Sequence, residues 1–362
     1  MSDAPSPLRE LFAPEENAAR GIRKRFRILK RSGQHLLALP LASREAVSAL
    51  RLYSPQRPAA RAAAVVLRTL LRFGLPTPLR VEECRISLSD PLSQFLSGLS
   101  PSWATADSGL GVLFGNPRAT GRRFVLMLFE NGRAVAVVKA GVGTAAKSLV
   151  EAEARFLQSA GNIGITAPLA VLESERVHAF AMRPFPGEAP RHSSHRDIQR
   201  VLQPWLVRTA SVPLSHLSGW AKVSAACGES PVWKENCVDA SSRNVFPAIA
   251  HGDFAPWNIK VHPRSGVWQV FDWERGEPLG VPGWDWLHFE LQTAILVHRE
   301  DLSALHRRID HLFAAPEFRD YAAQSGIAGL EGALLTAYLL HCVHVHPQTE
   351  GMASIKALLQ SR

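Results

Sequence analysis

The chain has 362 residues, of which 46% are hydrophobic and 20% are charged, and its formal net charge is +9. This density of apolar residues excludes a largely disordered chain and is enough for two or three globular domains. No apolar run reaches the roughly 18 to 20 residues that cross a bilayer, and the first residues lack the hydrophobic core of a secretory signal. We therefore expect a cytoplasmic protein without a transmembrane segment.

The positive charge is concentrated at the front of the chain. Residues 1–100 hold 16 Lys and Arg against 8 Asp and Glu, whereas the remainder holds 25 against 24. Such an asymmetry is typical of separate modules. It predicts a basic N-terminal extension over residues 1–100.

Four cysteines lie far apart, and no two form a CxxC pair. This pattern predicts free thiols in a reducing compartment, not a disulfide scaffold or a structural zinc site. They are Cys84, Cys227, Cys237 and Cys342.

The first hundred residues combine one strand and two helices in this interpretation. A dense basic cluster over 21–31 leads into an apolar run at 34–41 that predicts a strand. A helix is expected over 43–53, with Ser43 as its N-cap, and a second one over 57–73.

Beyond Trp103 the pattern changes to three β segments, at 109–115, 122–130 and 133–141. Asn131-Gly132 between the last two is a strong signal for a two-residue hairpin. A helix follows over 148–161, and two more strands lie within 170–185. From about residue 190 the pattern is mainly helical, with a β-rich interruption at 246–276.

The most informative residues lie in that interruption. An apolar strand leads into His251-Gly252-Asp253, and Asn258 follows five residues after the aspartate. A second apolar strand delivers Asp272. Two acids and an amide on adjacent loops form the oxygen-rich kind of site that Mg²⁺ prefers. Phosphoryl transfer from a nucleotide requires such a set, because one carboxylate orients the hydroxyl and the others hold the metal on the phosphates.

These residues resemble the motifs of the aminoglycoside phosphotransferase family, a branch of the protein-kinase-like fold that includes choline kinases. The family pattern HGDxxxxN stands complete at 251–258, and its metal-binding aspartate stands in Phe-Asp-Trp-Glu at 271–274. The resemblance implies that Asp253 is the catalytic base and that Asn258 and Asp272 bind Mg²⁺. His251 would brace the loop.

The same resemblance implies roles for residues upstream. Lys139, at the end of a strand, would contact the α- and β-phosphates of ATP or GTP. Glu153 is the best match for the helix glutamate that pairs with this lysine, and Glu151 is the alternative. Met182 begins the segment 182–188, whose backbone would face the adenine.

Two further assignments follow from the resemblance. The family often lacks the glycine signature of protein kinases, and we expect the nucleotide-covering turn at 115–121. There Gly121 and Arg118, or Arg122 beside them, would contact phosphate. Asp285 matches a structural aspartate that would cap the helix after the metal loop.

The implied architecture is α+β and bilobal. A small β-rich N-lobe would span 101–188, and a mainly helical C-lobe with the catalytic and metal-binding loops would span 189–362. The basic α/β extension at 1–100 lies outside the resemblance, which covers about residues 105–330.

Plainer interpretations stay open for several of these residues. The Asp253–Asn258 pair could be a turn device, Lys139 a surface lysine, and Glu153 a solvated helix charge. Most of the tryptophans near the motifs should pack beneath the loops, although Trp257 or Trp273 could stack on a substrate ring. A histidine cluster invites a metal hypothesis, with surface or capping roles favoured. It comprises His341, His344 and His346.

The basic helix at 57–73 carries arginines among Ala, Val and Leu. The favoured interpretation is an exposed face of a helix that packs on the N-lobe. The alternative is a surface for anionic lipid, a polyanionic glycan or nucleic acid, of which nucleic acid is the least favoured. The arginines are Arg57, Arg61, Arg68 and Arg72.

The function expected from all of this is transfer of the γ-phosphate of ATP or GTP to the hydroxyl of a small molecule. Residues 188–250 hold 7 bases and 5 acids, which is not the acidic cradle that a polycationic aminoglycoside favours, although 276–362 hold 10 acids and 6 bases. A sugar or glycan is therefore preferred as acceptor. The alternative is a catalytically inactive kinase-like protein, either nucleotide-binding or a scaffold, that docks on an anionic surface through its N-terminal part.

Overall fold

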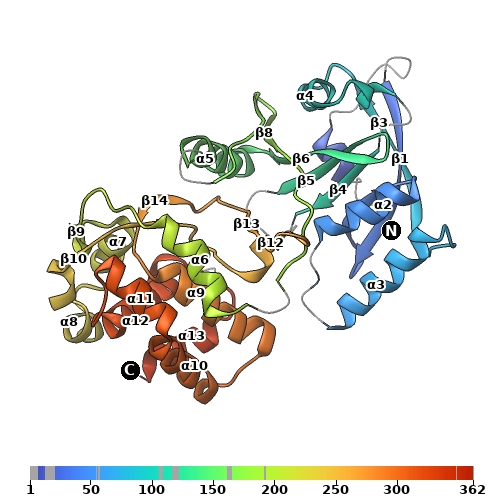
Figure 1. Ribbon diagram of the computed structural model, residues 1–362. Helices are drawn as coiled ribbons and strands as arrows, with labels where there is room; N and C mark the ends of the chain where they lie inside the picture. The colour runs from blue at the N-terminus through green and yellow to red at the C-terminus, as the bar shows by residue number, and fades with distance from the viewer. Residues whose placement is uncertain are drawn as a thin grey trace. The chain divides into compact units, whose positions relative to one another are not determined.

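The computed structural model describes residues 7–12, 21–53, 55, 58–105, 109–115, 122–160, 165–190, 193–347 and 349–361. The chain divides into two compact units, a first unit of residues 1–185 and a second unit of residues 186–362 (Figure 1). Within the described ranges, no helix is both long and apolar enough to cross a membrane.

One antiparallel sheet dominates the first unit. In the described residues it has eight strands, in the order β3-β1-β2-β4-β5-β6-β8-β7. β2 pairs with β4, so the sheet joins strands from 1–100 to strands from 101–188. The domain boundaries drawn from the sequence remain predictions. The strands are β1 (Gly21–Arg31), β2 (Gln34–Pro40), β3 (Arg80–Ser87), β4 (Leu110–Phe114), β5 (Arg123–Glu130), β6 (Arg133–Val142), β7 (Ala170–Glu173) and β8 (Val177–Met182).

The basic cluster at 21–31 is strand β1, which the sequence did not predict. Its side chains alternate between the two faces of the sheet, as a strand requires. Phe26 and Ile28 are buried, and the exposed Arg25 lies on the other face. Lys24 points inward as well, where its ammonium donates to the Thr105 carbonyl oxygen at 2.7 Å. Alternation therefore lets a run rich in Lys and Arg contribute to a core.

Helices cover both faces of this sheet. α2 and α3 pack on one face around Leu37 and Phe129, and Figure 1 shows both helices beside the same strands. α1 and α4 cover the other face, where Leu8, Leu96 and Trp103 join the larger core. α5 packs against β6 and β8. These helices are α1 (Pro7–Leu11), α2 (Ser43–Ala49), α3 (Pro58–Arg72), α4 (Pro91–Leu99) and α5 (Thr144–Ala160).

One expected cap is wrong. Ser43 is the first residue of α2, not its N-cap; the N-cap is Ala42, which makes no side-chain capping bond. The burial of Ala46 and Ala49 against the sheet accounts for the position of this helix without a polar cap.

The predicted hairpin at Asn131-Gly132 is confirmed. Both residues have positive φ, 51° and 72°, as the tight two-residue turn requires. The turn fixes the register of β5 and β6, which places Lys139 opposite Val125. On its other side Lys139 pairs with Phe180 of β8, so its backbone lies inside the sheet.

A buried aspartate connects α4 to the rest of the first unit. Asp90 accepts from the backbone N–H groups of Leu92 and Ser93 at 2.9 and 3.2 Å, and its other oxygen pairs with Arg176 at 2.5 Å. Asp90→Ala should lower the free energy of unfolding by about 2–4 kcal/mol, because it removes a cap and leaves the arginine without this carboxylate. Denaturant unfolding would measure this. The control is Ser194→Ala, which removes the exposed N-cap of the helix that begins at His195. It should lower the free energy of unfolding by only about 1 kcal/mol. Equal losses of stability in the two variants would contradict the prediction.

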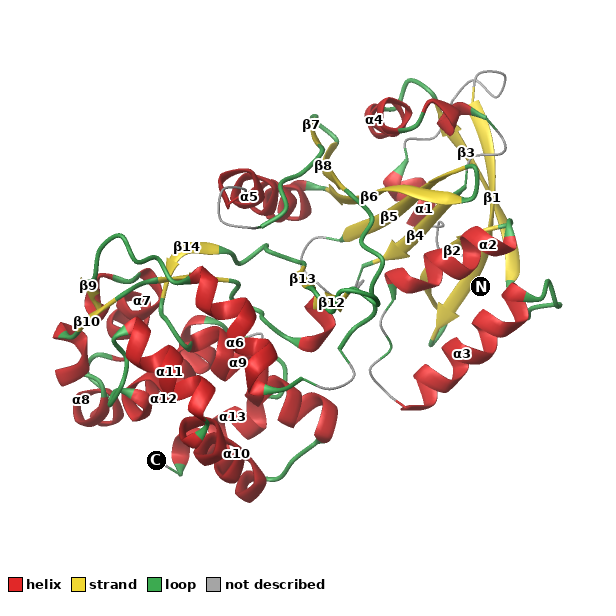
Figure 2. Cartoon of the chain, in the orientation of Figure 1, coloured by secondary structure: helices red, strands yellow, loops and turns green. Residues whose placement is uncertain are grey.

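The second unit is mainly helical, as the red ribbons of Figure 2 show. The expected α+β class, with a β-rich first part and a helical second part, is confirmed. Short strand pairs, β11 with β14 and β12 with β13, hold the loops that carry the motifs. The helices are α6 (His195–Leu202), α7 (Ser218–Cys227), α8 (Pro231–Asn236), α9 (Trp284–Gln292), α10 (Leu302–Ala314), α11 (Pro316–Ser325), α12 (Glu331–Leu340) and α13 (Met352–Gln360). The strands are β9 (Val212–Pro213), β10 (Asn244–Val245), β11 (Ala248–Ala250), β12 (Ile259–Val261), β13 (Trp268–Val270) and β14 (Glu277–Gly280).

Candidate active site

The loop after β11 is held by a buried aspartate on α9. The two carboxylate oxygens of Asp285 accept from the backbone N–H groups of His251 and Gly252, at 2.6 and 3.0 Å. Asp285 therefore supports this loop, and the expectation that it caps its own helix is wrong. The reason is geometric, because the second residue of α9 faces the loop and both carboxylate oxygens are used there.

His251 is the first residue of the same loop, and its side chain is fully buried. Its Nε2 lies 2.8 Å from the Phe271 carbonyl oxygen, and its Nδ1 accepts from the backbone N–H of Asp253 at 3.2 Å. Burial lowers the pKa of His251, which keeps the imidazole neutral with its proton on Nε2. The ring thus links the Asp253 loop to the end of the next strand and is not exposed to a reactant.

Asp253 is the acid that this loop presents. Asn258 Nδ2 donates to its Oδ2 at 2.9 Å, and His288 Nε2 lies 3.0 Å from its Oδ1. About a third of the side chain, 32%, stays exposed. Burial acts to raise the pKa of Asp253, but the hydrogen bond and charge of His288, with the charge of Arg275, hold it below its ordinary value. The carboxylate is therefore ionised at neutral pH, oriented on two sides and open on a third.

His288 and Tyr338 are site residues that the sequence analysis missed. The Tyr338 hydroxyl lies 2.8 Å from His288 Nδ1, so the imidazole is held at both nitrogens between the tyrosine and Asp253. Both side chains are buried. One signal was available: His288 stands three residues after Asp285, a spacing that places both on the same face of α9.

Removal of His288 tests whether this chain positions Asp253. A hydrogen bond to a charged group contributes about 1.5–3 kcal/mol, so His288→Phe should slow phosphoryl transfer about 10- to 100-fold. Loss of the bond raises the pKa of Asp253, so the acid limb of the pH–rate profile should move to higher pH. Tyr338→Phe keeps the imidazole and should have a smaller effect in the same direction. An unmoved acid limb in His288→Phe would show that the histidine is merely structural.

Asn258 and Asp272 lie at the same end of the β12–β13 hairpin. Ile259 pairs with Val270, and the backbone N–H of Phe271 donates to the Asn258 carbonyl oxygen at 2.8 Å. Asp272 follows with a positive φ of 69°, a rare conformation for a residue with a side chain. The Asn258 amide nitrogen is engaged by Asp253, which leaves its amide oxygen as the atom able to coordinate a cation. An amide oxygen and a carboxylate fit Mg²⁺, which takes few protein ligands and completes its shell with phosphate and water.

In the first unit, Lys139 and Glu153 form a buried ion pair. The Lys139 ammonium lies 2.5 Å from Glu153 Oε2, and the two side chains are 13% and 3% exposed. Glu151 is exposed and pairs instead with Arg155 on the same helix. Of the two glutamates considered, the one that contacts the lysine is thus Glu153.

The other residues expected to contact the nucleotide are Met182, Arg118, Gly121 and Arg122. Met182 ends β8, opposite Val137 of β6. Arg118 and Gly121 lie outside the described residues. Arg122 is engaged within the first unit, since its guanidinium pairs with Glu10 at 3.3 Å and lies over the Phe114 and Phe124 rings.

Several aromatic rings near the site pack against one another. Trp273 and Trp286 are fully buried, and Trp273 packs against the His251 ring at 4.7 Å. His341 stacks on Trp284 with ring centroids 4.8 Å apart. Among the described residues, no group of three or more His, Cys, Asp and Glu side chains could hold a metal ion.

Comparisons with known proteins give distant structural matches. The sequence matches no family model and no curated protein. A candidate fructosamine-3-kinase from Haemophilus somnus 129PT is 12% identical, with a TM-score of 0.42 over 74% of this chain and 97% of that one. A macrolide 2'-phosphotransferase from Brachybacterium faecium is 13% identical, with a TM-score of 0.42 over 69% and 90%. A Plasmodium vivax ethanolamine kinase is 10% identical, with a TM-score of 0.36 over 87% and 96%. At these values no activity or residue role passes from them to this chain.

Proposed function

We propose that the protein is a small-molecule kinase, which transfers the γ-phosphate of ATP or GTP to a hydroxyl group. The observation that carries this proposal is the setting of Asp253: ionised, fixed by Asn258 and His288, and still partly exposed. The open side leaves this oriented carboxylate able to accept a proton from a bound hydroxyl group. The oxygen ligands Asn258 and Asp272 at the adjacent hairpin end support the same function.

In the proposed reaction, the oxygen of the acceptor hydroxyl attacks the γ-phosphorus, and Asp253 accepts the proton that this hydroxyl loses. The bond from the γ-phosphorus to the β–γ bridging oxygen breaks, and the nucleoside diphosphate leaves. Asn258 and Asp272 would hold Mg²⁺, which when bound neutralises phosphate charge. Lys139, oriented by Glu153, would contact the phosphates. Asp285 and His251 keep the Asp253 loop rigid, because rate gains in such transfers come mainly from positioning and electrostatics.

A thermal-shift titration with ATP and GTP tests this proposal. A nucleotide at 100 times its dissociation constant adds about 2.7 kcal/mol to the stability of the protein. We expect wild type to be stabilised in a Mg²⁺-dependent manner, and Asp272→Ala to lose the Mg²⁺ dependence. If neither nucleotide stabilises wild type, the catalytic assignment fails and the scaffold alternative takes its place.

For the acceptor we propose a sugar or glycan hydroxyl, not an aminoglycoside. Two acids beside the Asp253 loop are already engaged: Asp285 binds backbone amides, and Glu277 binds Lys222. A polycation would find no free carboxylate in these two positions. Competing an aminoglycoside against a panel of sugars in a phosphoryl-transfer assay tests this, and transfer to the aminoglycoside alone would overturn it.

A specific surface supports the second proposed role, docking on an anionic membrane. On and after α3, Val65, Val66 and Phe73 are 59%, 58% and 70% exposed. Arg61 stands four residues before Val65 and eleven before Arg72 on the helix α3. These spacings place all three side chains along one face of the helix. Exposed apolar side chains flanked by arginines suit the boundary between anionic headgroups and acyl chains. Arg57 lies outside the described residues.

Vesicle binding separates this role from a purely solvated helix face. We expect the protein to sediment with phosphatidylcholine vesicles only when they contain phosphatidylserine, and salt to weaken the binding. Val66→Ser with Phe73→Ser should abolish it. Val238→Ser, which removes an exposed valine of the second unit, is the control and should bind as wild type does. Equal sedimentation with uncharged vesicles would contradict the proposal.

A further inference from the structure

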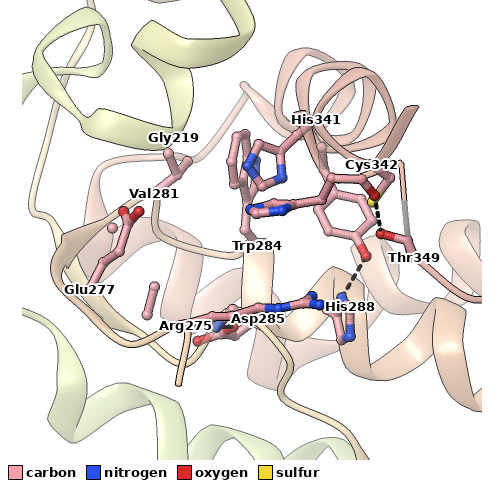
Figure 3. A pocket seen from close by; sticks show the side chains of 15 residues that line it. Gly219, Arg275, Glu277, Val281, Trp284, Asp285, His288, His341, Cys342 and Thr349 are labelled. Carbon is pink, nitrogen blue, oxygen red and sulfur yellow. Dashed lines mark hydrogen bonds between the residues drawn. The ribbon is translucent and has the colours of Figure 1, made fainter. Parts of the chain in front are cut away.

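A pocket of about 70 Å³ in the second unit borders the Asp253 loop. Gly252 and His288, the chain neighbour and the hydrogen-bond partner of Asp253, belong to its lining. Arg275, Trp284 and His341 also face it (Figure 3). A water molecule needs roughly 10–15 Å³ of cavity volume on this measure. The pocket therefore has room for about five waters or for a small ligand.

Arg275 is the notable charge in this pocket. Among the residues that the structure describes, none forms a hydrogen bond or an ion pair with its guanidinium. Its backbone is nonetheless fixed against the Asp253 loop, because a Cβ added at Gly252 would come within 2.9 Å of Arg275 Cβ and 3.0 Å of its carbonyl oxygen. In Figure 3 the side chain extends along one wall of the pocket. A fixed stem with a free guanidinium is suited to an anionic ligand.

The acids of the same pocket are already paired. Both oxygens of Asp285 accept backbone N–H groups of the Asp253 loop. Glu277 Oε1 accepts from the Lys222 ammonium at 3.1 Å and from the Ser218 hydroxyl at 3.4 Å. Neither carboxylate hydrogen-bonds to Arg275, so its guanidinium keeps its N–H donors for a ligand.

The histidines of the pocket add hydrogen-bonding capacity without charge. Burial, with the charges of His346 and Lys222, lowers the pKa of His341 to about 3. Burial and the charge of Arg275 also lower the pKa of His346. Two neutral imidazoles beside an aromatic wall of Trp284 and Tyr338 can bond hydroxyl groups, which donate and accept.

We propose that this pocket binds the acceptor and that the acceptor is a compact polyol bearing an anionic group, a carboxylate or a phosphate, which pairs with Arg275. The proposal rests on the kinase function proposed above and names the substrate class of that site. The anion at Arg275 would place the hydroxyl groups of the same molecule toward His288 and Asp253. An acceptor hydroxyl would then lose its proton to Asp253 as its oxygen bonds to the γ-phosphorus and the nucleoside diphosphate leaves.

Matched polyols that differ only in charge test this inference. A six-carbon series is gluconate, sorbitol and glucamine; a three-carbon series is glycerate, glycerol and 3-amino-1,2-propanediol. Calorimetric titration without nucleotide measures binding to the pocket, and the same compounds are then assayed as acceptors with Mg²⁺ and ATP or GTP. In at least one series we expect the acid to bind about tenfold or more tightly than the neutral compound, because a charge-assisted bond contributes about 1.5–3 kcal/mol. Glycerol 3-phosphate distinguishes phosphate from carboxylate.

Variants at the arginine show where the preference arises. In Arg275→Gln the acid and the neutral polyol should bind equally, and Arg275→Lys should retain part of the preference. Arg264→Gln removes an exposed positive charge from the β12–β13 turn and should keep the wild-type preference. A preference that survives Arg275→Gln, tighter binding of the neutral or cationic compounds, or no binding of any acid would each overturn the inference. Acid binding without nucleotide binding would uphold the pocket and overturn only the kinase function.

Discussion

Asp253→Asn should lower the rate of nucleotide-dependent phosphoryl transfer by about 10²–10⁴-fold, the usual contribution of a positioned general base. Asparagine keeps the size of the side chain and can still meet Asn258 and His288, but it cannot take a proton from a hydroxyl. The nucleotide should continue to stabilise the variant in the presence of Mg²⁺, since the proposed metal ligands are Asn258 and Asp272. Transfer of labelled γ-phosphate to the acceptor, together with a thermal-shift titration, measures both effects.

The control for this prediction is an aspartate outside the site. Asp310 on α10 is exposed, so Asp310→Asn should retain the wild-type rate. If Asp253→Asn loses nucleotide binding along with transfer, the aspartate contributes to the binding site and not specifically to proton transfer. If it transfers phosphate at the wild-type rate, the assignment of the base is wrong.

Several candidate residues named from the motifs meet in the structure, because these neighbours are close in the chain, and their roles remain predictions. Asp253 and Asn258 are five residues apart, and a short hairpin returns the chain to Asp272 beside them. Lys139 and Glu153 are fourteen apart, on a strand and the helix that packs on it. Contacts of this range follow from turn and helix geometry, which the sequence encodes directly.

Contacts of longer range could not be obtained in this way. His288 meets Asp253 across 35 residues, and Tyr338 meets His288 across 50. Neither separation is one that a helix, strand or turn imposes on its residues. The packing of α9 against α12 decides which of these side chains meet. The function of Asp285 was misjudged for the same reason: its position on a helix suggested a cap, whereas the loop 33–34 residues earlier takes both of its oxygens.

Strand β1 shows a different limit of sequence analysis. Its run of Lys and Arg dominates the composition and hides the two-residue alternation of Phe26 and Ile28. A buried Lys24 interrupts the expected polar and apolar pattern further, since its ammonium finds a carbonyl oxygen and the Trp103 ring inside the fold. Pairing with β2 and β3 holds this basic segment in the sheet as a strand.

Lys139→Met should strongly destabilise the first unit. The methionine fills the volume of the lysine stem, but it leaves the Glu153 carboxylate, 3% exposed, without the ammonium now 2.5 Å away. Breaking a buried pair from one side costs about 3–5 kcal/mol. Denaturant unfolding measures the loss. The exposed pair Glu151–Arg155 provides the control, because Arg155→Met should cost about 0.3–0.5 kcal/mol.

The double variant Lys139→Met/Glu153→Gln separates stability from nucleotide binding. It has no uncompensated buried charge, so it should regain much of the stability that Lys139→Met loses. It still lacks the cation proposed for the phosphates, so ATP and GTP should stabilise it far less than they stabilise wild type. Recovery of both stability and nucleotide binding would mean that the lysine serves only to neutralise Glu153. Recovery of stability alone is the expected result, because only the cation itself can contact phosphate.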